Sequence, residues 1–203
     1  TLATTDYCYT TANPATLVVN VAGGTGPFTY QLDSSAAVSS ALTTYSFANV
    51  TPGTHTILVT DSNNCTATIA NFVIAPQLGF NVSLINDLTC LVDASIDNPV
   101  ETGGYGAPYT YTVSREAGTP VVVTSFPYTT TQAGSYVFTV TDSRGCTASS
   151  NAIIVTPRTT PSHSTAKTDI SCNCLDNGTI TVTPSGGFTT TYTYAIKLST
   201  ATA

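Results

Sequence analysis

Apolar and polar residues alternate along residues 134–141, the clearest pattern in the chain. Tyr136, Phe138 and Val140 would share one face of a β-strand, with the residues between them on the other face. The run that follows, Asp-Ser-Arg-Gly at 142–145, is typical of a tight turn, because Asp bonds to nearby backbone amides and Gly adopts positive φ. A second strand is expected over residues 146–155, so the two strands predict a β-hairpin.

The same hairpin pattern occurs at residues 53–65, 81 positions earlier, and other features recur with it. Gly-Gly pairs at 23, 103 and 186 each form an expected turn that leads into a strand with the order aromatic-Thr-Tyr. Motifs that return at a fixed period indicate an array of similar units. We therefore expect one repeat over residues 1–76, a second over 77–157 and part of a third over 158–203.

The repeats predict an all-β protein made of tandem immunoglobulin-like β-sandwiches. No segment has helical periodicity, and each repeat has room for about seven strands separated by turn signals. The first strand of the second repeat is expected over residues 78–91. Tyr136 begins the expected sixth strand, where a tyrosine corner would tie the strand to the preceding loop, and His55 takes this place in the first repeat. A β-barrel is the alternative, although about 80 residues are few for eight closed strands.

The composition excludes several classes of partner. Charged residues make up 8% of the chain, the net charge is −6, and five basic residues are too few for a nucleic-acid surface. No run of eighteen apolar residues predicts a membrane span, and no signal peptide is evident.

The chain has no Met, which indicates a processed product or a segment of a longer polypeptide. Since the third repeat stops before its closing hairpin, we expect further polypeptide or a neighbouring chain to complete its sheet.

No catalytic, cofactor-binding or metal-binding residues are predicted. His55 fits a packed or corner role, His163 lies among Thr, Ser and Pro, and neither forms part of a repeated nucleophile–base set. We therefore expect no enzyme activity. Calcium between repeats is the metal hypothesis to weigh, but turn capping accounts for Asp61 and Asp142 without a metal. The other recurrent aspartates considered for calcium are Asp6, Asp87 and Asp169.

Six cysteines in recurring positions, without zinc-like spacing, favour an oxidising compartment and disulfides. Pairing within repeats would join Cys8 to Cys65 and Cys90 to Cys146. In an immunoglobulin-like fold, however, those partners lie at opposite ends of a strand, about 20 Å apart for six residues, whereas a disulfide needs Cα atoms within about 7 Å. If the repeats stack end to end, Cys8 meets Cys146, Cys65 pairs with a preceding repeat, and Cys90 and Cys172 pair with following repeats. Both alternatives stay open on the sequence.

Three motifs recur over both full repeats and the front of the third. They are a Cys before the second strand, Gly-Gly-x-x-Pro-[Phe/Tyr]-Thr-Tyr, and Gly-x-Tyr-x-x-x-Val-x-Asp-x-x-Gly-Cys. Together these motifs resemble the SprB-type repeat of Bacteroidetes cell-surface adhesins. His55 replaces the Tyr, Asn64 replaces the Gly before Cys65, and the third Gly-Gly turn lacks Pro, which leaves local turn geometry open. The resemblance implies a cell-surface filament, exported by type IX secretion and used in adhesion or gliding.

These observations predict a structural and adhesive segment of a secreted, extracellular filament. The short connection at residues 75–78, Ala-Pro-Gln-Leu, favours a stiff rod over flexibly linked domains. The expected partners are neighbouring repeats of the same chain or of identical chains, and surface glycans. A carbohydrate-binding module of an extracellular protein is the alternative function, although the chain has no Trp to stack on sugar rings.

Overall fold

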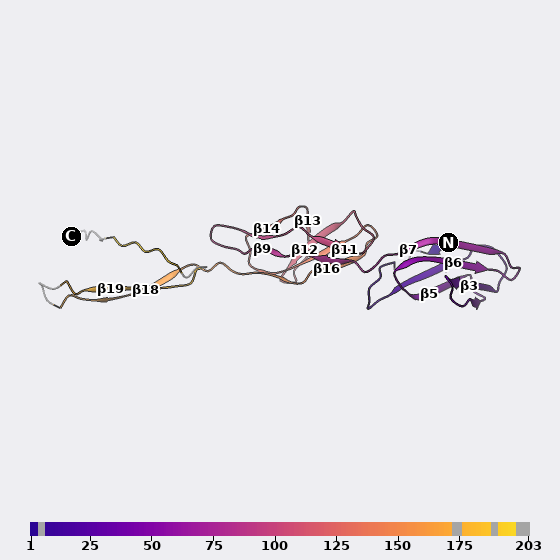
Figure 1. The fold of residues 1–203 in the computed structure, drawn as a ribbon, viewed down its shortest axis with the longest axis horizontal. Coiled ribbons are helices and arrows are strands. Elements are labelled where there is room, and N and C mark those ends of the chain that lie inside the picture. Colours follow the sequence, from indigo (N-terminus) through magenta and orange to yellow (C-terminus); the bar gives the residue numbers. More distant parts are fainter. Residues whose placement is uncertain (4–6, 172–175, 188–190, 198–203) are drawn as a thin grey trace.

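The computed structural model describes residues 1–3, 7–171, 176–187 and 191–197, and these form an all-β protein. Three units follow one another along a single long axis (Figure 1). Within these described ranges, the strands of each unit pair only with strands of the same unit. No helix capable of crossing a membrane occurs in this part of the chain.

The first unit is an immunoglobulin-like sandwich of two antiparallel sheets. One sheet has the order β1-β2-β5 and the other has the order β4-β3-β6-β7. The chain crosses from one sheet to the other after β2, after β4 and after β5, as in immunoglobulin-type folds, and the other consecutive strands pair within one sheet. The strands are β1 (Leu2–Ala3), β2 (Ala15–Asn20), β3 (Phe28–Leu32), β4 (Val38–Ser40), β5 (Thr44–Val50), β6 (Gly53–Thr60) and β7 (Thr66–Ile74).

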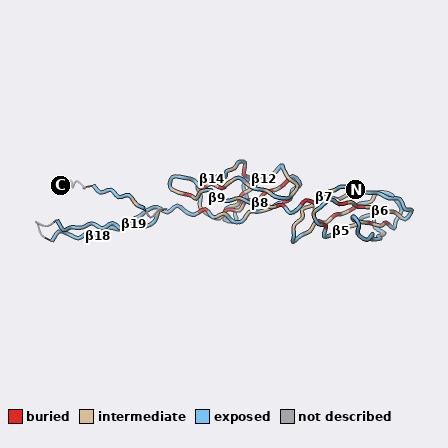
Figure 2. The backbone as a smooth tube through the Cα atoms, viewed as in Figure 1, coloured by how far each residue is buried: buried red, intermediate tan, exposed pale blue. Residues whose placement is uncertain are grey.

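The core of this sandwich comes from alternate residues of facing strands. Leu17 and Val19 of β2 face the interior, as do His55, Ile57 and Val59 of β6. The residues between them are partly exposed, so each strand has one buried side (Figure 2). The alternation of the sequence therefore specifies which face each sheet turns inward.

The second unit repeats the two sheets with small changes. One sheet has the order β14-β10-β9; the other has the order β13-β12-β15-β16, with β17 also paired to β15, and β8 and β11 form a short extra pair. As predicted, Tyr136, Phe138 and Val140 are buried in the core. The strands are β8 (Gly79–Asn81), β9 (Leu84–Asn86), β10 (Ala94–Ile96), β11 (Val100–Thr102), β12 (Thr110–Arg115), β13 (Val121–Val123), β14 (Tyr128–Thr130), β15 (Gly134–Thr141), β16 (Thr147–Ser149) and β17 (Ile153–Val155).

The tyrosine corner is present in the second unit and a histidine replaces it in the first. The Tyr136 hydroxyl donates to the carbonyl oxygen of Gln132 at 2.7 Å, four residues upstream. In the first unit the ring nitrogen Nε2 of His55 lies 2.8 Å from the carbonyl oxygen of Thr51, also four residues upstream. The corner role predicted for His55 is confirmed.

Two predicted strands are interrupted. The strand expected over residues 146–155 divides into β16 and β17, because the Ser150 hydroxyl accepts from the Phe138 amide in place of a backbone carbonyl. The strand expected over residues 78–91 divides into β8, which pairs with β11, and β9, which pairs with β10. After β9 the chain turns, so Cys90 lies in a turn and not at the end of a strand.

The third unit contains one antiparallel pair, β18 (Ser162–Thr168) with β19 (Thr179–Ser185). The prediction of a strand after the third Gly-Gly turn is wrong for the described residues 191–197, because they have no regular secondary structure. Almost every residue of β18 and β19 is exposed, in contrast to the complete sandwiches (Figure 2).

Candidate functional site

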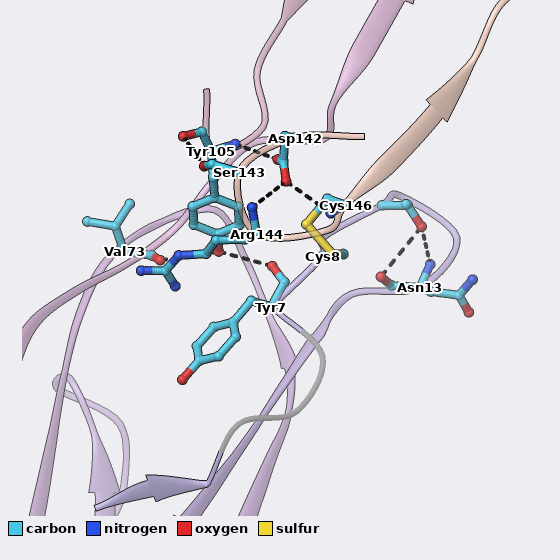
Figure 3. Close-up of a disulfide and its surroundings, with 10 residues drawn as sticks. Tyr7, Cys8, Asn13, Val73, Tyr105, Asp142, Ser143, Arg144 and Cys146 are labelled. Atoms are coloured by element: carbon cyan, nitrogen blue, oxygen red, sulfur yellow. Dashed lines mark hydrogen bonds between the residues drawn. A yellow bond between two sulfur atoms is a disulfide. The ribbon is translucent and has the colours of Figure 1, made fainter. Parts of the chain in front are cut away.

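The junction between the first two units is the most highly organised site outside the two cores. A disulfide joins Cys8 near the start of the first unit to Cys146 in the second, across 138 positions of sequence (Figure 3). Their Cα atoms are 5.3 Å apart, within the usual range for a disulfide. Cys146 is buried, and it begins the return arm of the β15–β16 hairpin.

Asp142 holds the hairpin turn that carries Cys146. Its Oδ1 accepts the backbone amides of Arg144 at 2.9 Å and Cys146 at 3.0 Å, and its Oδ2 accepts that of Tyr105 at 2.7 Å. The carboxylate is buried, so these amides replace its water shell. Asp142 therefore fixes both the hairpin turn and the Gly-rich turn at the same end of the sandwich.

Backbone contacts attach this end of the second unit to the connection that precedes it. The Gly104 amide donates to the carbonyl oxygen of Pro76 at 2.9 Å. At Gly103, which has a φ of +65°, a Cβ atom would lie 2.2 Å from the carbonyl oxygen of Gln77. From the first unit, the Thr11 amide donates to the side-chain oxygen of Gln77 at 3.2 Å. Glycine is thus required where the turn meets the connection.

Tyr105 and Arg144 extend from the second unit onto the first. The Tyr105 hydroxyl lies 3.0 Å from the carbonyl oxygen of Tyr7 and 3.3 Å from that of Val73. The Arg144 guanidinium lies 4.5 Å from the ring centre of Tyr105 and 5.1 Å from that of Tyr7 (Figure 3). Each cation–π contact at an exposed site is worth about 0.5–1 kcal/mol. These contacts surround the disulfide and restrict rotation about it.

The cysteine pairing agrees with the end-to-end alternative and not with pairing inside repeats. Cys146 is bonded to Cys8 and is therefore not available to Cys90. Cys65 and Cys90 are exposed and form no disulfide. Cys172 lies outside the described residues, as does Asp6. The pairings Cys8–Cys65 and Cys90–Cys146 are wrong because the structure puts those partners at opposite ends of a sandwich.

The far end of the first unit is built like the junction end of the second. Asp61 accepts the amides of Asn63, Cys65 and Thr25, at 2.9, 2.9 and 3.1 Å. Led by the bond from Cys65, these bonds lower the pKa of the Asp61 carboxyl below its usual value. Asn64 adopts a φ of +61° where the second unit has Gly145 at +88°. The Asn64 replacement therefore preserves the turn, and Cys65 is exposed where Cys146 is bonded.

His55 and the described aspartates considered in the sequence analysis have structural partners. His55 Nδ1 lies 2.7 Å from Oδ2 of Asp33, whose Oδ1 accepts the Thr56 amide. Burial alone would raise the pKa of the Asp33 carboxyl, but the bonds from His55 and Thr56 outweigh it and lower that pKa. His163 is exposed in β18. Asp87 accepts the Thr156 amide at 2.9 Å, and Asp169 accepts from the Lys167 ammonium at 2.9 Å.

Among the described residues, no three His, Cys, Asp or Glu side chains converge as metal ligands would. The junction's chemistry is a covalent link with polar and aromatic contacts around it. The sequence analysis did not identify Tyr105 and Arg144. The available signal was their difference from Thr25 and Asn63, which hold the same positions in the first unit.

Comparisons with known proteins support part of this description. The family model named SprB repeat matches residues 7–37 and 164–200, the front parts of the first and third units. No curated protein matches the chain significantly. A structure of three N-terminal domains of the bacteriophage RB49 Highly Immunogenic Outer Capsid protein (Hoc) is 14% identical. The matched region covers 93% of this chain and 69% of the Hoc chain, with a TM-score of 0.39. A structural similarity this low supports no inference about this chain. The resemblance to the SprB repeat is thus confirmed in residues 7–37 and 164–200, although the match does not extend over the second unit.

Proposed function

We propose that this chain is a structural and adhesive segment of a secreted bacterial surface filament, with no enzymatic role. The SprB-repeat match is typical of surface-associated repeat proteins and supports an extracellular location. The single observation that carries the mechanical part of the proposal is the Cys8–Cys146 bond between successive sandwiches. A covalent link beside a four-residue connection lets force pass through the junction without separating the units.

The polar contacts of the junction support the same role. Tyr105 and Arg144 add contacts with the first sandwich beside the disulfide, and Gly104 ties the turn to Pro76. Cys65 and Cys90 are proposed to form equivalent bonds with preceding and following repeats. The partners are accordingly repeats of the same chain or of identical chains, and surface glycans are proposed as the adhesion target. Type IX secretion and a part in gliding belong to the same proposal.

Electron microscopy of the native surface material, labelled with an antibody raised against residues 1–157, tests this function. We expect label along thin rods whose repeat spacing is close to the length of one sandwich. Label on globular particles, or confined to the interior of cells, would contradict the proposal. A glycan array probed with the same two-repeat fragment separates a filament segment from a carbohydrate-binding module. Strong, selective sugar binding in the absence of rods would favour the module.

A further inference from the structure

The corner of the first repeat contains a histidine whose two ring nitrogens both face acceptors. His55 Nε2 lies 2.8 Å from the carbonyl oxygen of Thr51, and Nδ1 lies 2.7 Å from Oδ2 of Asp33. A backbone carbonyl only accepts hydrogen bonds, so Nε2 must carry a proton. Since a neutral imidazole has a single N–H, the contact at Nδ1 depends on the state of Asp33.

The surroundings of Asp33 favour its ionised form. The Thr56 amide donates to Oδ1 of this carboxyl group at 2.7 Å, and such a bond stabilises a carboxylate. Burial alone would raise the pKa of the Asp33 carboxyl, but the bonds from His55 and Thr56 lower it. An ionised Asp33 has no proton to give to Nδ1, so Nδ1 must donate as well.

Asp33 is the titratable group that faces the ring. Among the described residues, no other acidic or basic side chain forms an ion pair or a hydrogen bond with His55. On the side of β7 the ring faces the uncharged ring of Phe72, with 5.6 Å between the ring centres. The His55 side chain is 10% exposed and that of Asp33 is 43% exposed. Water therefore replaces the contacts of the histidine poorly.

We propose that Asp33 and Thr51 hold His55 as an imidazolium, and that this arrangement makes the corner of the first repeat a pH-sensitive switch that the second repeat lacks. Loss of one ring proton removes one of the two hydrogen bonds, because a neutral ring donates only once. In the second repeat the corner hydroxyl of Tyr136 donates to Gln132 at 2.7 Å. A tyrosine hydroxyl ordinarily keeps its proton up to about pH 10.

The switch lies at the junction end of the first repeat. His55 of β6 is paired with Phe72 of β7. The carbonyl oxygen of the next residue, Val73, lies 3.3 Å from the Tyr105 hydroxyl of the second unit. We expect release of the corner to loosen β6 where it pairs with this part of β7. The inference does not depend on the filament role.

The direction of the pH effect follows from proton binding. A histidine in an unfolded chain loses its second proton near pH 6.5, whereas the folded first repeat retains that proton on His55. The folded state therefore binds more protons above this pH, and its stability falls as the pH rises. Below about pH 6 both states hold the proton, so this contribution is constant.

Nitrogen-15 NMR of the full chain with labelled histidine tests the protonation directly. The chain has two histidines, and His163, exposed in β18, is the internal control. At pH 7.5 we expect two ring N–H signals from His55. His163 should give the shifts of a solvated ring, which is mostly neutral at about this pH. A single ring N–H on His55 would overturn the proposal, because Nδ1 would then accept its bond from a protonated Asp33.

Amide hydrogen exchange of the full chain measures the structural consequence. Residues 51–57 and the corresponding residues 132–138 are compared at pH 6 and pH 8.5, with correction for the intrinsic effect of pH on exchange. We expect protection of residues 51–57 to fall at least about tenfold at the higher pH, because a charge-assisted hydrogen bond is lost. Protection of residues 132–138 should change by less than about twofold.

Substitutions separate the switch from general effects of pH. His55→Tyr introduces the residue of the second repeat and should remove the pH dependence of residues 51–57. His163→Ala, the matched control, should leave that dependence unchanged. If His55→Tyr does not fold, Asp33→Asn removes the carboxylate and should reduce the tenfold change to less than about threefold. Equal loss of protection in both repeats, no loss in the first, or an unchanged response in the folded corner variant would overturn the proposal.

Discussion

Phe138 shows how one side chain holds a repeat together. It is fully buried, its ring centre lies 5.3 Å from that of Tyr128 in an edge-on arrangement, and it packs in the core with Tyr136 and Val113. Thr139, the next residue, lies on the other face, where its hydroxyl is 3.0 Å from that of Ser149. Adjacent residues of one strand therefore make very different contributions to stability.

We expect Phe138→Ala to lower the free energy of unfolding of the second repeat by about 3–5 kcal/mol, through lost burial and the cavity that is left. Thr139→Ala, the matched control, should cost less than about 1 kcal/mol. Urea titrations of the two-repeat fragment, monitored by tyrosine fluorescence, compare the two. Equal losses would mean that the inward face of β15 is assigned incorrectly.

Aspartates that accept backbone amides also make the fold sensitive to acid. The Asp61 pKa is lowered chiefly by the Cys65 amide; burial would raise the Asp87 pKa, but the bonds from Thr156 and Leu88 outweigh it. Because folding lowers these pKa values below the reference of 3.8, their stabilisation is complete above that pH. It is lost as the pH falls through the lower folded-state pKa.

The midpoint temperature of thermal unfolding should therefore be nearly constant between about pH 5 and about pH 6 and fall below about pH 4. The decline should be smaller in the Asp87→Asn variant, which has no carboxylate to protonate at that position. Asp169→Asn, at the exposed position directly after β18, is the control and should follow the unmodified chain. An Asp87→Asn profile that also coincides with the unmodified one would exclude Asp87 as a source of acid sensitivity.

At the scale of elements, the β15–β16 hairpin was predictable because its information is local. Alternation fixes the buried face of β15, and Asp142 with Gly145 fixes the turn. The break between β16 and β17 depends instead on a single hydroxyl, that of Ser150, accepting from Phe138. Propensity cannot reveal such a contact, since Ser also occurs in uninterrupted strands.

The prediction of one continuous strand over residues 78–91 was wrong for a similar reason. Its two halves pair with different strands, and the Ser83 amide donates to Asp97 at 2.7 Å where they separate. The junction was partly predictable, because the geometry of a sandwich puts Cys8 and Cys146 at ends that meet. The roles of Tyr105 and Arg144 were not predictable, because their contacts cross between units and produce no hydrophobic periodicity in the sequence.

The turn held by Asp142 makes its own prediction. Asp142→Ala leaves three buried or partly buried amides without an acceptor, at a cost of about 1–3 kcal/mol to the second repeat. Asp61→Ala is the matched change in the first repeat, where the turn contacts no other described unit. Both should lower the unfolding midpoint of their own repeat in calorimetry. Only Asp142→Ala should speed reduction of the Cys8–Cys146 bond by a small thiol, and equal rates would contradict this.

At the scale of the whole molecule, the junction determines whether two repeats behave as one rigid body. Three kinds of contact act together there: the disulfide, the hydrogen bond from Gly104 to Pro76, and the contacts of Tyr105 and Arg144 with the first unit. The polar contacts are partly exposed and individually weak, so we expect the disulfide to maintain the orientation.

Residual dipolar couplings measure that rigidity directly. In the oxidised fragment 1–157, one alignment tensor should fit the couplings of both repeats. In Cys8→Ser, each repeat should require its own tensor, while the chemical shifts of both cores are retained. Cys65→Ser, an exposed cysteine at the other end of the first repeat, should leave the single tensor unchanged. A single tensor in Cys8→Ser would show that the noncovalent contacts suffice.

The pattern of disulfides in native material gives the last prediction. Cys65 follows the same aspartate-capped turn as Cys146, yet it is exposed and unbonded, as is Cys90 in its turn at the other end of the second unit. If every junction is linked as the first is, each cysteine pairs with one in an adjacent repeat. Non-reducing peptide mapping should therefore yield a linked peptide containing Cys8 and Cys146. Cys65 and Cys90 should each be linked to cysteines of neighbouring repeats. A linked peptide containing Cys8 and Cys65 would contradict this arrangement, because those residues could meet only if the sandwich were wound differently.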